Sequence, residues 1–243
     1  RANFLIFNEP KDQDERQNLF YLTKFIPEKI DWVWLIGDDD YLWDENTITK
    51  VCEEITKNED IFLLCVPPVF RSNGNSYTEK DTIINLTTKY GFHELICWFS
   101  GTIMRRNEFK KTYLNFTDQR QKIRYNTNNP SKESLSSAFQ HATSILELFG
   151  NSKALFFDEK LIAPQNSKPT VNTIDRWQNE NLNDRFIHVL DDIFVLIEKK
   201  VLRKMPRSFF RYHGYHYWDH CIYLLIKEIK NNKSELKKDK NFL

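Results

Sequence analysis

The stretch Trp32-Val-Trp-Leu-Ile-Gly-Asp-Asp-Asp-Tyr-Leu42 is the strongest indication of fold in this chain. Residues 32–36 form a continuous apolar run between Asp31 and Gly37. Such a run is typical of a strand that is buried on both faces, as in a parallel sheet. Three adjacent aspartates follow at the point where this strand should end. The stretch therefore predicts a buried strand that brings a cluster of carboxylates to one edge of a sheet.

The residues that follow complete a strand–helix–strand unit. Residues 44–57 carry apolar side chains at helical spacing, and Asp44 or Asn46 is placed to cap the helix N-terminus. Residues 61–66 form a second apolar run, which two prolines end. Elements of these lengths and in this order predict a βαβ unit with a right-handed crossover.

The rest of the chain divides into two unequal parts. Apolar runs and amphipathic stretches alternate in the first part, whereas only helical periodicity remains after about residue 181. The sequence predicts an α/β domain over residues 1–168 and a C-terminal helical extension over residues 169–243. Within the first part we expect strands at residues 3–7, 95–104 and 154–162, helices at residues 13–25 and 134–149, and a polar loop at residues 71–77.

Composition excludes several classes of protein. Of the 243 residues, 40% are hydrophobic and 28% are charged, which is a globular balance and argues against a disordered chain or a rod. The formal net charge is only +1, so no nucleic-acid partner is expected. No apolar run approaches the roughly 20 residues that span a bilayer. The four cysteines form no C-x-x-C pair and are expected to be reduced thiols in a cytoplasmic protein.

The aspartate cluster itself points to a metal site. Adjacent carboxylates repel one another unless a cation compensates their charge, and ligands of open α/β sheets bind beyond the carboxyl ends of the strands. Hard cations such as Mn²⁺ or Mg²⁺ are bound by one or two carboxylates together with substrate phosphates. Asp38, Asp39 and Asp40 are therefore the candidate metal ligands. The alternative is a solvated turn of aspartates that caps the next helix.

The quoted stretch resembles the D-x-D segment of family 2 glycosyltransferases with the GT-A fold. It is most similar to a bacterial branch that has the segment WLLGDDD and that assembles surface polysaccharides. The resemblance is tight over about eleven residues and looser over about residues 1–165. It implies a Rossmann-like, mostly parallel sheet flanked by helices. Many members have an aspartate where Gly37 stands, so it stays open which two of the three aspartates contact the metal.

Further positions agree with this family. Asn18 resembles an asparagine that lies near the donor, and residues 98–106 resemble a strand that ends in two arginines and borders the acceptor cleft. Residues 164–177 resemble a loop that closes over the donor with a tryptophan, here Trp177. The resemblance thus implies donor contacts from Asn18, Asp38 and Trp177. The first βαβ unit of the family, which holds the nucleotide base, is expected to lie upstream of Arg1.

The catalytic base is expected on the helix at residues 134–149. Relatives often carry an acidic base at the place where this chain has Gln140-His141. A histidine there can accept the proton of an attacking hydroxyl near neutral pH, so His141 is the candidate base. The alternative is that His141 only makes a structural hydrogen bond. Glu94 and Glu147 are the alternative bases.

The resemblance implies a metal-dependent and inverting glycosyltransferase. Its expected donor is a nucleotide-diphosphate sugar, and its expected acceptor is a hydroxyl of a capsule, lipopolysaccharide or similar surface glycan, free or lipid-linked. The metal, Mn²⁺ or Mg²⁺, would neutralise the charge that builds up on the leaving diphosphate. Two alternatives are a metal-dependent phosphoryl hydrolase, which needs further acids at other strand ends, and a non-enzymatic carbohydrate-binding module.

A basic and aromatic stretch follows the α/β part. Residues 198–211 contain six basic side chains and one acid, and aromatic residues are frequent from Phe209 to Trp218. Basic residues interleaved with aromatic ones suit an anionic membrane surface, so we expect a cytoplasmic enzyme that attaches peripherally to the inner face of the cell membrane. The alternative is a solvated basic face beside an aromatic core.

Overall fold

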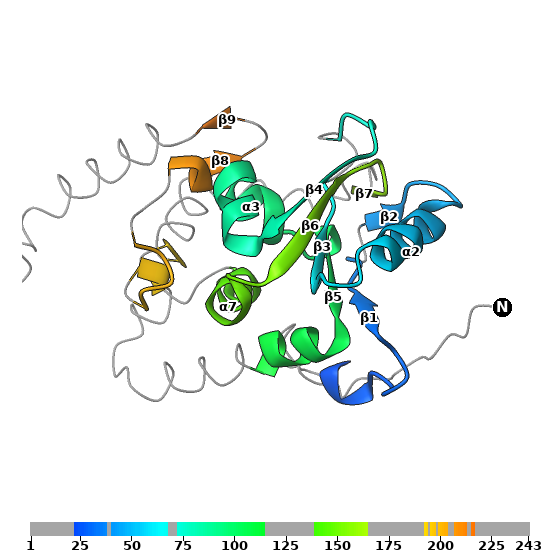
Figure 1. Ribbon diagram of the computed structural model, residues 1–243, viewed down its shortest axis with the longest axis horizontal. Coiled ribbons are helices and arrows are strands. Elements are labelled where there is room, and N and C mark those ends of the chain that lie inside the picture. Colours follow the sequence, from blue (N-terminus) through cyan, green and yellow to red (C-terminus); the bar gives the residue numbers. More distant parts are fainter. Residues whose placement is uncertain are drawn as a thin grey trace, which may run out of the picture.

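The computed structural model describes residues 22–37, 40–67, 72–114, 139–164, 192–193, 195–197, 199–203, 207–212 and 215–216. In these ranges a five-stranded sheet lies between helices, with α2 (Thr47–Lys57) on one side and α3 (Ile83–Tyr90) and α7 (Gln140–Phe149) on the other (Figure 1). Residues 22–25 and 106–114 are also helical. The prediction of a mixed α/β fold is confirmed. The expected strand at residues 3–7 lies outside the described residues.

The sheet has the strand order β1-β5-β3-β6-β4. These strands are β1 (Trp32–Trp34), β5 (Thr102–Arg105), β3 (Leu63–Cys65), β6 (Lys153–Asp158) and β4 (Tyr77–Thr82). β3 and β6 are parallel, whereas the pairs β1–β5, β5–β3 and β6–β4 are antiparallel. Because β5 is antiparallel to both β1 and β3, these two strands run parallel with β5 between them. The described sheet is therefore mixed, where the sequence predicted a mostly parallel one.

β1 packs on the cores of both faces, Val33 on the side of α7 and Trp32 and Trp34 on the side of α2, but it is less buried than predicted. Trp32, Val33 and Trp34 are all half-buried, and Ile36 beyond the strand exposes 41% of its surface. Within the described part of the chain, β1 is the last strand of the sheet on its side and pairs with β5 alone. The guanidinium of Arg105, on that neighbour, lies 5.0 Å from the ring of Trp32 and covers part of it.

Alternating side chains of β3 and β6 fill two cores, one on each face of the sheet. Leu63 and Phe156 belong to the α7-side core, to which α3, α4 and α7 contribute. Leu64 and Leu155 belong to the α2-side core, which includes Val51 of α2. This period of two is the reason why the strands read as continuous apolar runs in the sequence.

The segment predicted as one strand at residues 95–104 consists of three elements. It contains α4 (Phe92–Ile96), the 3₁₀ turn η1 (Phe99–Gly101) and β5. A Cβ on Gly101 would lie 2.9 Å from the Trp98 ring and 2.9 Å from the Val66 carbonyl oxygen, so only glycine allows this close approach of the turn to β3.

Three further differences concern strand and helix limits. The expected strand at residues 154–162 is two strands, β6 and β7 (Ile162–Pro164), because the chain turns at residues 159–161. β7 pairs with β2 (Asp40–Leu42) in a small antiparallel sheet. β4 and α3 follow the expected polar loop and have no counterpart in the sequence prediction. Of the predicted helix at residues 134–149, Gln140–Phe149 is helical, and residues 134–138 lie outside the described residues.

Described residues of the C-terminal region pack on the same α7-side core. Ile193, Leu196 and Leu202 belong to this core. Phe209 of η2 (Arg207–Phe210) is fully buried, and its ring stacks on Phe92 with centroids 5.7 Å apart. Next to it, β8 (Arg211–Tyr212) pairs with β9 (Tyr215–His216). The division at residue 168 stays a prediction.

Candidate active site

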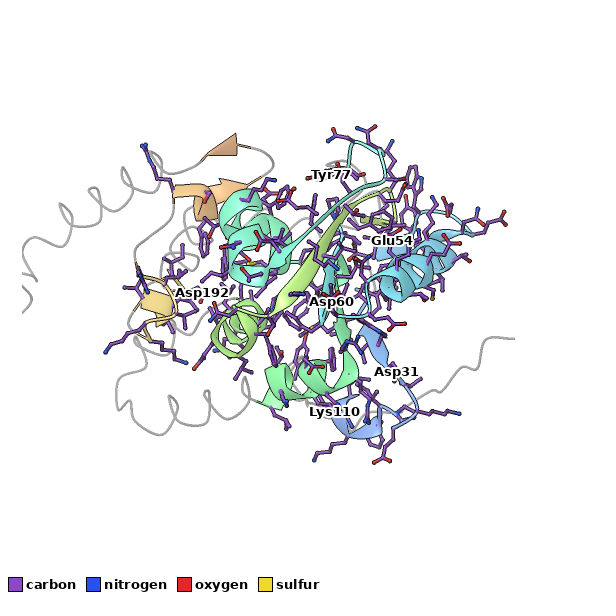
Figure 2. All side chains as sticks on the ribbon, viewed as in Figure 1. Asp31, Glu54, Asp60, Tyr77, Lys110 and Asp192 are labelled. Carbon is purple, nitrogen blue, oxygen red and sulfur yellow. The ribbon has the colours of Figure 1, made fainter. Side chains whose placement is uncertain are left out.

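The carboxyl ends of β1, β3 and β6 lie at one edge of the sheet, because these three strands run parallel to one another. Tyr77 pairs with Asp158 and marks this edge. Asp60, which accepts hydrogen bonds from Lys80 and Lys153, marks the other. Figure 2 shows Tyr77 and Asp60 toward opposite ends of β6. Ligands of α/β sheets bind at the edge where parallel strands end, so the candidate site is the edge near Tyr77.

Asp40 is the predicted metal ligand that the structure describes at this edge. It begins β2, where it pairs with Pro164 of β7, and its backbone N–H donates to the Gly37 carbonyl at 3.1 Å. The chain therefore turns sharply after β1 and returns along β7. Asp38 and Asp39 lie outside the described residues.

Two side chains from the segment before β5 hold the carboxylate of Asp40. The indole N–H of Trp98 donates to Asp40 Oδ2 at 3.2 Å, and the Ser100 hydroxyl donates to the same oxygen. The Ser100 Oγ also accepts the backbone N–H of Gly37 at 2.9 Å, and the Ser100 carbonyl accepts the Trp34 indole N–H at 2.9 Å. One serine thus joins the end of β1, the turn and the carboxylate.

Asp40 has two features of a carboxylate that binds a metal ion. Carboxylates that bind metals are commonly oriented by hydrogen bonds from neighbouring groups, and Asp40 receives two such bonds on one oxygen. Its oxygen chemistry suits Mn²⁺ or Mg²⁺. In the part of the chain that the structure describes, no three His, Cys, Asp or Glu side chains are grouped to hold a metal ion. Further ligands would have to come from residues outside the described ranges, for which Asp38 and Asp39 are the candidates, or from a bound diphosphate.

A second acidic pair lies at the same edge and was missed in the sequence. Asp158 ends β6 and accepts hydrogen bonds from the backbone N–H of Asn73 at 3.1 Å and from its side-chain amide at 3.2 Å. The next residue, Glu159, accepts the Ser76 hydroxyl and lies 3.6 Å from Lys50 Nζ. The available signal was an Asp-Glu pair directly after a buried apolar run, the same pattern that marks the aspartates after β1.

Hydrogen bonds keep Glu159 ionised. Burial raises the pKa of this carboxyl, but the Ser76 hydroxyl, the Lys160 backbone N–H and the Lys50 ammonium together hold the pKa below its ordinary value. Lys50 also lies 3.3 Å from Asp44 at the start of α2. This lysine therefore connects α2 to the end of β6 through two carboxylates.

His141, the predicted base, lies in the first turn of α7. Only 3% of the residue surface is exposed, and the imidazole stacks on Phe99 with ring centroids 3.9 Å apart. Nε2 lies 3.1 Å from the Cys97 carbonyl oxygen, which can only accept, so Nε2 carries the proton in this contact. Burial lowers the pKa of His141 to about 4, so the ring is neutral at pH 7.

The structure does not bring His141 and Asp40 into contact. Cys97 and Phe99, the partners of His141, belong to the α7-side core, whereas Trp98, a partner of Asp40, packs on the α2-side core. The two side chains therefore approach the same segment from opposite sides. The catalytic role of His141 stays a prediction.

The other predicted residues are placed as follows. Glu94 lies on α4, whose buried residues belong to the α7-side core, and Glu147 on α7 forms an ion pair with Lys199 at 2.7 Å. Asn18 and Trp177, the predicted donor contacts, lie outside the described residues. Of the predicted site, the structure thus defines the Asp40 turn and the surroundings of the three candidate bases.

Comparisons with known proteins give no relative: no protein-family model, no curated protein and no solved structure matches the chain. None of the described helices is both long and apolar enough to cross a membrane. The function therefore has to be inferred from the residues and their geometry.

Proposed function

We propose that this protein is a metal-dependent glycosyltransferase. It would transfer one sugar from a nucleotide-diphosphate donor to a hydroxyl of a surface glycan, free or lipid-linked, with inversion at the anomeric carbon. The observation that carries the proposal is the turn after β1, where Trp98 and Ser100 hold the carboxylate of Asp40 in a fixed orientation. A carboxylate fixed in advance binds a cation without the cost of ordering a flexible side chain.

The position of this turn also supports the proposal. It lies at the edge where three parallel strands end, which is where α/β sheets bind nucleotides and other ligands. Asp38, Asp39 and Asp40 would hold Mn²⁺ or Mg²⁺, which when bound would neutralise charge on the leaving diphosphate. The protein's own contribution is to orient the carboxylates, and Ser100 does this for Asp40.

Transfer also requires a group that accepts the proton of the acceptor hydroxyl, and this group must lie within hydrogen-bond reach of that hydroxyl. His141 is buried and donates Nε2–H to a carbonyl. A catalytic role for His141 would therefore require the first turn of α7 to rearrange. Turnover of His141→Ala tests this role, because loss of a general base lowers kcat by roughly 10²- to 10⁴-fold with donor affinity little changed.

One observation favours a second candidate, a metal-dependent phosphoryl hydrolase. Such enzymes need acids at more than one strand end, and Asp158 and Glu159 supply them at the end of β6. Both carboxylates are already bound by Asn73, Ser76 and Lys50, which argues that they stabilise the fold.

The experiment that separates the two candidates is a screen of nucleotide sugars with Mn²⁺, followed by analysis of the products. If the protein is a glycosyltransferase, one or a few donors should protect it against thermal unfolding. It should then release nucleoside diphosphate when a glycan acceptor is added. A hydrolase instead cleaves the diphosphate with water and releases nucleoside monophosphate and a sugar phosphate without any acceptor. Failure of every donor to stabilise the protein, together with release of a sugar phosphate, would contradict the proposed transfer.

A further inference from the structure

We infer that residues 97–100 act as a brace through which His141, as a positioning residue, sets the orientation of the Asp40 carboxylate. This brace joins α4 to β5. Its four side chains alternate between the two faces of the sheet, so a group that is bound on one face can determine the geometry on the other.

On the α7-side face, His141 fixes the backbone and one ring of the brace. Its Nε2–H donates to the Cys97 carbonyl at 3.1 Å, and its imidazole stacks on Phe99 with an interplanar angle of 26°. Both contacts are buried, since His141 exposes 3% of its surface and Cys97 exposes 5%. The imidazole therefore holds two residues of the brace, the first and the third.

On the opposite face, the second and fourth residues of the brace hold the candidate metal ligand. Trp98 and Ser100 both donate to Asp40 Oδ2, and Ser100 also binds the Gly37 N–H and the Trp34 indole. These contacts join the brace to both ends of the Gly37–Asp40 turn.

The brace has little freedom to absorb a displacement of His141. A side chain at residue 101 would have no room between the Trp98 ring and the Val66 carbonyl. The Val66 N–H also donates to the Gly101 carbonyl at 2.8 Å. The Thr102 hydroxyl donates to the Phe99 carbonyl at 2.9 Å. A displacement at Cys97 or Phe99 must therefore appear at Trp98 and Ser100, because packed interiors transmit strain.

The coupling between His141 and Asp40 is independent of what the site binds. Its importance for metal binding rests on the proposed function. If Asp40 is a metal ligand, the brace is the outer layer that orients it, and loss of such partners commonly weakens metal binding by 10- to 100-fold.

The first test observes the coupling without any ligand. The indole N–H resonance of Trp98 is assigned in the full chain by its loss in Trp98→Phe. We expect His141→Gln to shift or broaden this resonance, although His141 does not contact the indole. Ile145→Val, a core change on the same helix α7, should leave it unchanged. An unchanged resonance in His141→Gln contradicts the brace. Should His141→Gln not fold, Phe99→Leu removes the stacked ring and makes the same comparison.

The second test measures the binding of Mn²⁺ alone by electron paramagnetic resonance. We expect Ser100→Ala and His141→Gln each to weaken binding by about 10- to 100-fold, while Ile145→Val binds like the wild type. Equal affinity in His141→Gln and in the wild type would show that the brace does not act on the metal. If the wild type binds no Mn²⁺, the proposed function fails, and the Trp98 resonance still decides whether the brace exists.

Discussion

Ser100 is the residue on which most contacts of the candidate site converge. Its hydroxyl donates to Asp40 and accepts from the Gly37 N–H, and the residue exposes only 1% of its surface. We expect Ser100→Ala to lower the free energy of unfolding by about 1–3 kcal/mol, because the Gly37 N–H and the Asp40 carboxylate each lose a hydrogen-bond partner. Urea unfolding measures this. Thr56→Ala, at an exposed hydroxyl of α2, is the control and should change stability by less than about 0.5 kcal/mol.

His141 makes the stability of the protein depend on pH. Its pKa is lowered from 6.5 to about 4 by burial, so the unfolded chain binds a proton at this residue where the folded chain does not. The contribution of the neutral ring is complete above about pH 6.5 and decreases as the pH falls toward 4, by at most about 1.4 kcal/mol per pH unit. Urea unfolding at pH 7.0, 6.0 and 5.0 should show this decrease in the wild type. It should be smaller in His141→Gln, and an equal decrease in both proteins would contradict the assignment.

The short turn after the helical residues 195–197 has unfavourable backbone geometry. Lys200 adopts a φ of 59°, in the left-handed region, and the Val201 N–H then bonds back to the Leu196 carbonyl at 2.9 Å. A non-glycine residue in this region costs roughly 1–2 kcal/mol, part of which glycine recovers. We therefore expect Lys200→Gly to raise the unfolding free energy by about 0.5–1 kcal/mol.

The control for this prediction is Arg203→Gly. Arg203 is also exposed and basic but has no positive φ. Glycine there should leave the stability unchanged or lower it, because it adds only freedom to the unfolded chain. A loss of stability in Lys200→Gly equal to that in Arg203→Gly would contradict the account of the turn.

The apolar strands could be predicted from the sequence, and the polar or irregular elements could not. β3 and β6 read as apolar runs because both of their faces are covered by cores. β4 has a polar sequence, Tyr-Thr-Glu-Lys-Asp-Thr, and pairs only with β6 among the described strands, so it lacks the apolar signal of a buried strand. The turn before β5 depends on the contact of Gly101 with Val66, which no local pattern reveals.

The candidate site could likewise be predicted from the sequence only in part. The position of Asp40 shortly after β1 followed from an apolar run, a glycine and three aspartates. Its hydrogen bonds to Trp98 and Ser100 could not be predicted, because these residues are 58 and 60 positions away in the sequence. The burial of His141 likewise depends on Phe99 and Cys97, which only the folded chain brings to α7.

On the surface of the whole molecule, some of the basic side chains at residues 198–211 are exposed and another is paired. Lys200, Arg203 and Arg207 are exposed, whereas Lys199 is bound to Glu147 and Phe209 is buried in the α7-side core. Phe209 is therefore part of a buried aromatic core, which was the alternative interpretation of this stretch, and it cannot insert into a membrane. We expect the exposed charges to attract anionic lipid, by about 1 kcal/mol for each basic residue near the surface.

Co-sedimentation with vesicles that contain anionic lipid tests this attachment. We expect binding at low salt that weakens at high salt and is lost when Lys200, Arg203 and Arg207 are replaced by glutamine. Replacing Lys24, Lys29 and Lys111 by glutamine removes the same charge elsewhere and should preserve binding. Recovery of the wild type in the supernatant at every salt concentration would contradict peripheral attachment.

The central claim is that the turn after β1 binds a divalent cation together with a diphosphate. Thermal unfolding of the full chain with Mn²⁺, with a nucleoside diphosphate, and with both tests it most directly. We predict that the two together raise the melting temperature by more than the sum of their separate effects. This gain should be lost in Asp40→Asn and kept in Asp31→Asn, which removes the same charge at the amino end of β1. An equal gain in wild type and Asp40→Asn, or no gain from the combination, would contradict the claim.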